Sequence, residues 1–274
     1  MKKLIKIELY RSFHSRTFGF AIAIGTILSI LQLVMGVIPT SIHLEEYLAF
    51  NMPMKYPGFL YVAWIGGDLN SFFSYLYFLI LPIISALPFA DSFFMDAKGG
   101  FIQNICIRAN KKQYYLSKYI ATFLSGGSAV TFPLILNFLI SMLLLPSMKP
   151  ETTAGTGLIG EASTFPQLYY NHPILYVLLF LAIIFIFSGL LADFGLVSSY
   201  IAGYRFLVLL APFILYLFLM AGFNLIGIDS WQPINFLRPS YSQDALIPMI
   251  LETIILFLIT AFGFIYRGGK GDIY

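Results

Sequence analysis

Long apolar segments alternate with short polar ones along this chain. Six segments are long enough to cross the roughly 30 Å of hydrocarbon in a bilayer. They cover residues 18–38, 71–90, 119–145, 174–202, 206–226 and 246–266. Each is apolar on every face, whereas a membrane strand would be short and alternating. The pattern therefore predicts an all-α integral membrane protein with six transmembrane helices.

The first 16 residues have the pattern of an amphipathic helix. Leu4, Ile5, Leu9 and Phe13 recur at helical spacing, and the lysines of this segment occupy other positions. We expect this interfacial helix to lie along the inner membrane surface, with its apolar side chains toward lipid. A signal peptide is a poorer interpretation, because the apolar run at 18–38 has full span length and no A-x-A-like site follows it.

The composition supports lipid surroundings. The 274 residues are 59% hydrophobic and 11% charged, against roughly half and a quarter in soluble domains. A water-soluble fold with 28 Phe and 18 Tyr would expose large apolar patches. The single cysteine, Cys106, excludes an intrachain disulfide. No connecting segment is long enough for an independent domain, so we expect residues 1–274 to form one transmembrane domain.

Lysine and arginine predict the orientation, because they are retained on the cytoplasmic side during insertion. With the N-terminus inside, all but three of the 16 cations fall on the inner side. The three outer cations are Lys55, Lys149 and Arg238. Both termini are therefore predicted to be cytoplasmic, in a multi-pass protein of the cell membrane.

The inner loop at residues 91–118 is the most informative polar segment. After Gly99 and Gly100, the apolar residues occupy one face of a short helix. That face consists of Phe101, Ile102, Ile105 and Cys106, and the cations Arg108, Lys111 and Lys112 follow. Such a helix can dock on a partner or lie on anionic headgroups, and an ordinary basic loop is an equal alternative.

Two carboxylates fall within predicted spans, where they are costly and usually functional. Glu252 lies about two turns into the last span, roughly 10 Å from its start, and is the candidate pathway or gating residue. A buried structural acceptor is the alternative. Asp193 lies near the inner end of its span, where a helix cap or an ion pair with Arg205 would account for it.

Aromatic residues and small residues suggest two further features. The aromatic residues of the outer loops suit the belt at the membrane interface. They are Tyr56, Tyr61, Trp64, Tyr169, Tyr170 and Trp231. In the first span, the pairs Gly19/Ala23 and Ala21/Gly25 have the spacing of a close helix contact.

Motifs for nucleotide binding, metal binding and hydrolysis are missing from the sequence. Gly268–Gly271 resembles a P-loop only superficially, since it lacks the spacing and the hydroxyl residue. HExxH and G-x-S-x-G do not occur. We therefore expect no catalytic residue, no metal site and no cofactor in this chain, and no nucleic-acid partner.

The leader MKKLIKIELYRSF, the six spans and the inner loop together resemble the permease subunits of ABC-2 type transporters. In that family the loop has an acidic residue, a glycine, a short helix, a basic stretch and a Tyr-x-x-x-Lys lead into the third span. The matching positions are Asp91 or Asp96, Gly99–Gly100, residues 101–107, Arg108–Lys112 and Tyr114–Lys118.

The resemblance implies an ATP-driven exporter. Two permease chains, identical or related, would pair around a pathway above two cytoplasmic ATPase subunits, which would hold the ATP and Mg. The loop helix and its cations would couple to the ATPase through Phe101, Ile102, Ile105, Arg108, Lys111 and Lys112. The resemblance does not specify a substrate.

Three other functions stay open. An ion-coupled carrier would titrate Glu252 and should show an internal repeat, which is not evident. A membrane anchor or immunity subunit would bind an ATPase without moving a substrate. An intramembrane enzyme would use Glu252 or Asp193, but neither belongs to a recognisable catalytic motif.

Overall fold

The structure is a computed structural model that describes residues 2–43, 59–108, 110–150, 159, 163–242, 244–266 and 268, without the side chains of Cys106 and Arg108. Every regular element in this part of the chain is a helix. Among the described residues, five helical segments are long and apolar enough to cross a membrane. The prediction of an all-α membrane protein is confirmed.

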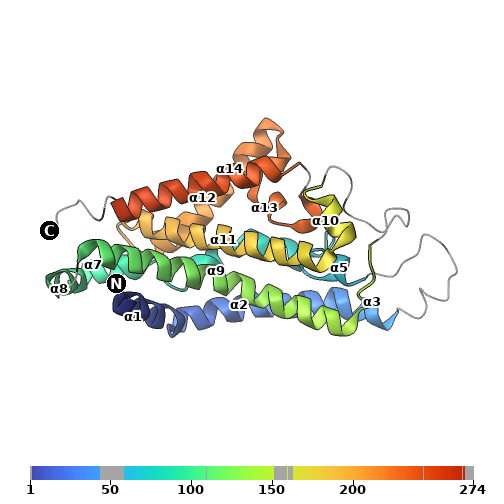
Figure 1. Cartoon of the computed structure of the whole chain (residues 1–274), viewed down its shortest axis with the longest axis horizontal. Helices are drawn as coiled ribbons and strands as arrows, with labels where there is room; N and C mark the ends of the chain where they lie inside the picture. Colours follow the sequence, from blue (N-terminus) through green and yellow to red (C-terminus); the bar gives the residue numbers. More distant parts are fainter. Residues whose placement is uncertain are drawn as a thin grey trace.

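The five long segments run along the longest axis of the molecule (Figure 1). They are α2 (Arg16–Gln32) with η1 (Leu33–Val37) and α3 (Ile38–Ile42), α9 (Lys111–Leu144), α11 (Pro173–Ser198), α12 (Arg205–Ile226), and α14 (Leu246–Thr260) with η4 (Ala261–Tyr266). Both η1 and η4 are π-helical turns that continue the preceding helix.

The second predicted span, 71–90, is shorter in the structure than the sequence indicates. Helix α6 covers Phe72–Ala86, which is 15 residues, or about 22 Å at 1.5 Å per residue. A turn follows at residues 87–91, where Pro88 has no amide hydrogen to continue the helical ladder. Six full-length spans are therefore not what the described residues show.

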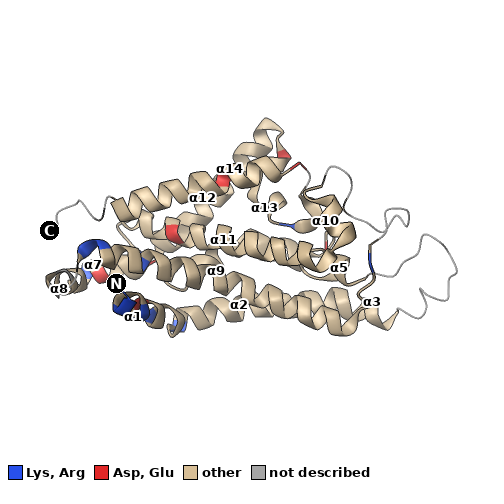
Figure 2. Ribbon diagram, viewed as in Figure 1, with Lys and Arg blue, Asp and Glu red and all other residues tan. Residues whose placement is uncertain are grey.

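Short helices gather at the two ends of the bundle (Figure 1). At one end lie α1 (Lys2–Phe13), α7 (Ser92–Lys98) and α8 (Phe101–Arg108). Toward the other end lie α5 (Leu60–Ala63), α10 (Pro166–Asn171), η2 (Asp229–Trp231), α13 (Pro233–Phe236) and η3 (Pro239–Tyr241). Lysine and arginine are concentrated at the end that holds α1 and α7 (Figure 2), which we call the basic end.

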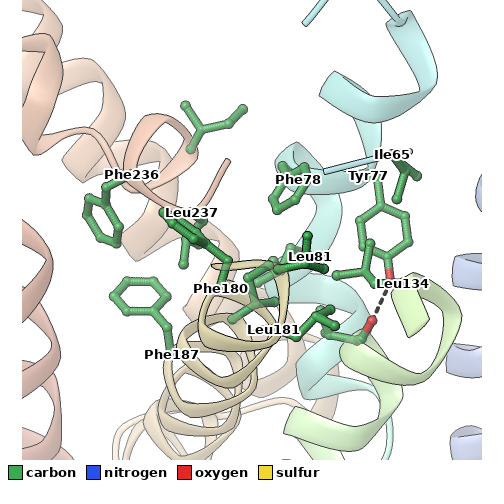
Figure 3. Packing of buried hydrophobic residues seen from close by; sticks show 14 of the residues in the cluster. Ile65, Tyr77, Phe78, Leu81, Leu134, Phe180, Leu181, Phe187, Phe236 and Leu237 are labelled. Atoms are coloured by element: carbon green, nitrogen blue, oxygen red, sulfur yellow. Dashed lines mark hydrogen bonds between the residues drawn. The ribbon is translucent and has the colours of Figure 1, made fainter. Parts of the chain in front are cut away.

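Helix α11 is the centre of the bundle and packs against α6, α9, α12 and α14. Its contact with α9 is close because Gly126 and Gly189 have no side chain. A Cβ at Gly126 would lie 2.5 Å from that of Ala192. Side chains such as Phe180, Leu181 and Leu81 fill the space between helices (Figure 3). In lipid such packing, rather than exclusion of water, holds helices together.

The segment after α5 folds into the bundle and does not lie at its surface. Trp64 is 1% exposed, and the Ile65 amide donates to Asn137 Oδ1 of α9 at 2.9 Å. A Cβ on Gly66 would lie 2.3 Å from the Trp64 ring, so only glycine permits this path.

The predicted interfacial belt is therefore wrong for Trp64 and for two tyrosines. Tyr61 and Tyr169 are 4% and 2% exposed, so both belong to the core of the protein. Trp231 and Tyr170 are half-buried. Tyr56 lies outside the described residues.

Candidate coupling site at the basic end

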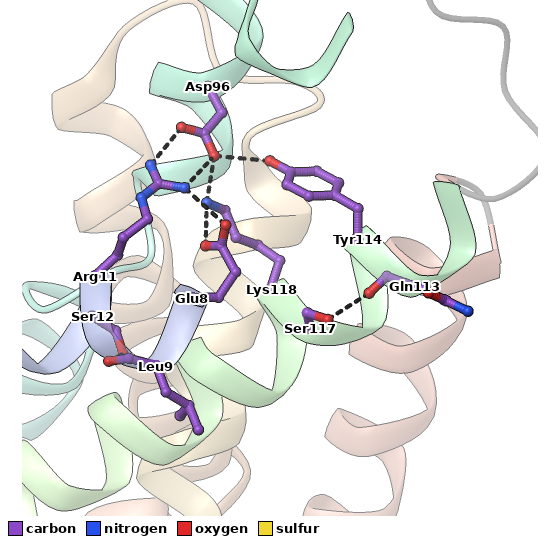
Figure 4. A network of polar contacts seen from close by, with 9 residues as sticks. All are labelled: Glu8, Leu9, Arg11, Ser12, Asp96, Gln113, Tyr114, Ser117 and Lys118. Atoms are coloured by element: carbon purple, nitrogen blue, oxygen red, sulfur yellow. Dashed lines mark hydrogen bonds and ion pairs between the residues drawn. The ribbon is translucent and has the colours of Figure 1, made fainter. Parts of the chain in front are cut away.

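A buried ionic network joins α1, α7 and α9 at the basic end (Figure 4). Lys118 of α9 donates to Glu8 at 3.0 Å and to Asp96 at 2.5 Å. Arg11 donates to Glu8 and to Asp96, each at 2.8 Å. The Tyr114 hydroxyl also donates to Asp96, at 2.8 Å. Two acids and two bases thus form a neutral cluster, which we call the four-charge network (Glu8, Arg11, Asp96 and Lys118).

Three members of the four-charge network are buried, and the side chain of the fourth, Arg11, is 33% exposed. Lys118 is fully buried, Glu8 is 1% exposed and Asp96 is 5% exposed. Burial alone would raise the pKa of Asp96, but hydrogen bonds and charge from Arg11 and Lys118 lower it below its ordinary value. Burial likewise disfavours the charged form of Arg11. The hydrogen bonds and charges of Asp96 and Glu8 outweigh this effect of burial and raise the pKa of Arg11. Each member of the four-charge network therefore depends on its partners.

Helix α1 is turned differently from the sequence prediction. Its buried residues are Glu8 and Ser12, and this polar face packs against α9. Leu4, Ile5 and Leu9 are half-buried along its sides. The helix is thus held by the four-charge network and not by lipid contact alone.

The short helix expected after Gly99 and Gly100 is α8. Gly100 has a φ of +68°, a conformation that glycine adopts without strain, and it allows the chain to turn between α7 and α8. The Phe101 ring lies 4.8 Å from the Arg11 guanidinium carbon, a cation–π contact. The four-charge network therefore also reaches the first residue of α8.

The predicted coupling residues are not all on one accessible surface. Ile102 is 6% exposed and packs with Phe93, Tyr114 and Phe264, and Ile105 packs against the same cluster. Phe101 and Ile107 are 38% and 83% exposed.

The cations after α8 begin helix α9. Asn110 caps that helix by accepting from the Lys112 amide at 3.0 Å. Lys112 is exposed and Lys111 is half-buried. The side chain of Arg108 lies outside the described residues. The coupling role of all these residues stays a prediction.

A second ion pair braces the same end. Arg205, the first residue of α12, pairs with Asp91 at the N-terminus of α7. The predicted pair between Asp193 and Arg205 is therefore wrong. Asp193 is fully buried, and neither of its oxygens has a hydrogen-bond partner among the described residues.

Glu252 lies on α14, away from the basic end. It is 8% exposed, and its oxygens also lack a hydrogen-bond partner within the described part of the chain. Glu252 acts electrostatically on Tyr216 of α12, whose hydroxyl donates to the Phe78 carbonyl at 3.0 Å. A structural role as hydrogen-bond acceptor would need a donor beside Glu252, and the described residues provide none.

The sequence analysis did not predict the ion pair between Glu8 and Lys118. Glu8 is the only acidic residue in the first 44 residues, and it precedes Arg11 by three positions. These two features were the signal in the sequence for a role of Glu8 in an ion pair. Its pairing with Lys118 depends on the tertiary structure.

No protein-family model, curated protein or solved structure matches this chain.

Proposed function

We propose that this chain is the membrane-spanning subunit of an ATP-driven exporter of the ABC-2 type. It would pair with a second permease chain, identical or related, and bind cytoplasmic ATPase subunits that hold the ATP and Mg. The main support is the four-charge network, which joins α1, α7 and α9 through ion pairs and reaches the first residue of α8 through the cation–π contact between Arg11 and Phe101.

The basic end has the properties that a coupling surface needs. Helix α8 exposes Ile107 and Phe101, and Lys112 follows on the exposed start of α9. Behind this surface, Ile102 packs with Tyr115 and Phe264, which belong to α9 and η4. A partner that moved α8 would therefore move the ends of at least two long helices.

The proposal keeps six crossings with both ends cytoplasmic. Helix α6 would make the short second crossing, since it is enclosed by α2, α9, α11 and α12 and faces little lipid. Helix α1 and the end of η4 both pack on α9 near its first turns. Chain ends on one side of the membrane require an even number of crossings.

Transport in this proposal follows from differential binding. ATP would favour one arrangement of the ATPase subunits, and the ATPase would favour one position of α8. A ligand can shift the permease only by such a difference in affinity between two states. The catalytic chemistry would lie entirely in the partner, consistent with the missing nucleotide motifs in this sequence.

Co-purification with the candidate ATPase tests the proposal. We expect the triple charge reversal Arg108→Glu, Lys111→Glu and Lys112→Glu to abolish association while membrane insertion is retained. The matched control reverses Lys2, Lys3 and Lys6, three exposed cations of α1 at the same end. Equal co-purification of the two variants and the wild type would refute the coupling assignment.

Two alternatives predict different results in reconstituted vesicles. An ion-coupled carrier would transport without any ATPase and depend on Glu252. A non-transporting anchor or immunity subunit would bind the ATPase and show no ATP-dependent movement of any solute. The exporter requires both association and ATP-dependent transport.

A further inference from the structure

The exposed face of α1 combines cations with apolar side chains. It lies at the basic end (Figure 2), opposite the buried Glu8 and Ser12. Ile7 is 52% exposed and Tyr10 is 65% exposed, and the Tyr10 ring stacks on the ring of His14 with centroids 4.0 Å apart. The face consists of Lys2, Lys3, Lys6, Ile7, Tyr10 and His14, and we call it the lysine face.

Within the described part of the chain, no acidic side chain balances the cations of the lysine face. The described acids on or beside α1 and α7 are Glu8, Asp91 and Asp96, and all three are buried. Glu8 and Asp96 belong to the four-charge network, and Asp91 pairs with Arg205. The acids of this end are therefore engaged inside the protein, and the lysine face keeps its positive charge.

The four-charge network holds α1 at the depth of the lipid headgroups. Lys118 precedes Leu144, the last residue of α9, by 26 residues. This is about 37 Å across a bilayer at the usual helix tilt of about 20°. The hydrocarbon is about 30 Å thick, and the headgroups extend it to about 40–45 Å. With Leu144 at one edge of the hydrocarbon, Lys118 lies in the opposite headgroup layer, and its ion pair with Glu8 fixes α1 beside it.

The junction with α2 keeps α1 near the membrane surface. Ser15 has an extended backbone, with φ of −73° and ψ of 145°, and its hydroxyl accepts from the Phe18 amide at 3.0 Å. Helix α2 therefore starts anew at this point and α1 is not its straight continuation. The Thr17 hydroxyl lies 3.0 Å from the Pro88 carbonyl oxygen, which ties the junction to the end of α6.

From these observations we propose that the lysine face of α1 binds anionic phospholipid headgroups. The lysines would contact the phosphates, and Ile7 and Tyr10 would enter the boundary between headgroups and acyl chains. An acidic protein surface would match the charge but would not account for exposed apolar side chains at headgroup depth. Each lysine near an anionic leaflet should contribute about a fivefold preference. The inference does not depend on an ATPase.

Lipid retention by the full chain tests the charge. The probe is a vesicle of phosphatidylcholine with a minor share of phosphatidylglycerol, and mass spectrometry counts the lipids that stay bound after exchange into detergent. The wild type should hold phosphatidylglycerol several-fold above its share, and Lys3→Gln with Lys6→Gln should lose most of this enrichment. The matched control, Lys98→Gln with Lys112→Gln, removes two exposed cations of α7 and α9 and should retain it. Equal enrichment in the two double variants would overturn the proposal.

A spin label tests the placement of the lysine face independently of charge. Ile7→Cys and Ile107→Cys, each combined with Cys106→Ser, carry the label on α1 and on α8. Nickel chelated to lipid headgroups should relax the label at position 7 strongly and the label at position 107 weakly, although Ile107 is also exposed. The reverse order would show that the lysine face points away from the membrane and would refute the proposal. Neither test uses nucleotide or an ATPase, so failure of the exporter function would not affect the outcome.

Discussion

The ammonium group of Lys118 lies 3.0 Å from a carboxylate oxygen of Glu8, although 110 residues separate the two. This contact fastens the N-terminal helix to the start of α9, and Asp96 brings α7 to the same ammonium. The helix that precedes the first span and the loop that follows α6 therefore form one body at the basic end. Buried charges of this kind are costly to separate, since each loses its counter-charge away from water.

Removing the central cation should destabilise this end strongly. Lys118→Met keeps an unbranched side chain one atom shorter but leaves Glu8 and Asp96 with Arg11 as their counter-charge in the four-charge network. We expect a loss of roughly 3–5 kcal/mol, as for one partner of a buried ion pair. Thermal unfolding in detergent and protease cleavage after α1 would measure it.

Two controls separate charge from packing in that experiment. Lys6→Met removes an exposed cation of α1 and should leave the melting temperature unchanged. The double variant Lys118→Met with Glu8→Gln removes one charge of each sign and should recover part of the loss. If both Lys118 variants melt like the wild type, the four-charge network contributes nothing to stability.

Close packing of α9 and α11 predicts an effect at Gly126. A Cβ there would meet Ala192 at 2.5 Å and the Ser85 carbonyl at 2.8 Å. Gly126→Ala should therefore cost about 1–3 kcal/mol, as for overpacking of a core. Gly19→Ala, where nothing lies within 4 Å, should be neutral or slightly stabilising. Equal melting temperatures for the two variants would argue against the observed approach of α9 and α11.

The long helices could be predicted from hydropathy, but their ends could not. Helix α9 begins at Lys111, eight residues before the apolar span predicted at 119. Hydropathy indicates only which residues can face lipid. The first eight residues of α9 include Lys118, whose charge is balanced by Glu8 and Asp96, and both acids are distant in the sequence. The small-residue pairs show the same limit. A Cβ on Gly25 would meet Pro133 at 2.8 Å, whereas one on Gly19 would have nothing within 4 Å. The spacing of the pairs alone does not distinguish these two positions.

The candidate site was predictable only as a segment. The glycine pair, the short helix and the basic stretch of residues 91–118 follow local patterns, and α8 lies where they indicate. Which face of α8 is available does not follow from local pattern. Ile102 and Phe101 are both apolar neighbours, but only tertiary packing buries the first and leaves the second accessible.

Helix α8 offers two isoleucines with opposite surroundings. Ile107 is 83% exposed, and Ile102 is 6% exposed. We expect Ile107→Glu to reduce association with the ATPase several-fold without changing the melting temperature. Ile102→Ala should instead destabilise the chain by about 2–5 kcal/mol, as for a buried aliphatic side chain. Pull-down and thermal unfolding of both variants would show whether association with the ATPase and stability of the fold depend on different residues of α8. Unchanged association in Ile107→Glu would count against docking on α8.

Glu252→Gln tests the pathway or gating role. The amide keeps the volume of the buried side chain and removes its ability to ionise, so folding should be retained. We expect transport-coupled ATP hydrolysis to fall more than expression does. Thr253→Val is a neighbouring control, because that hydroxyl only donates to the Met249 carbonyl one turn earlier at 2.7 Å. Wild-type hydrolysis in Glu252→Gln would assign Glu252 a structural role.

The lowered pKa of Asp96 predicts how the basic end responds to acid. Its stabilising effect should be complete above the pKa of an unfolded aspartate, about 3.9. It is lost as the pH falls through the still lower pKa of the folded protein, because a protonated Asp96 no longer pairs with Arg11 and Lys118. Thermal unfolding from pH 7 to pH 3 should therefore show the wild type losing stability below about pH 4.

Asp96→Asn isolates that contribution. The variant should be less stable than the wild type at neutral pH, and the difference in the free energy of unfolding should shrink as the pH falls below about 4. Other carboxylates titrate in both proteins, so only the difference reports on Asp96. A constant difference over the whole pH range would mean that Asp96 does not change its protonation on unfolding, contrary to its position between two cations.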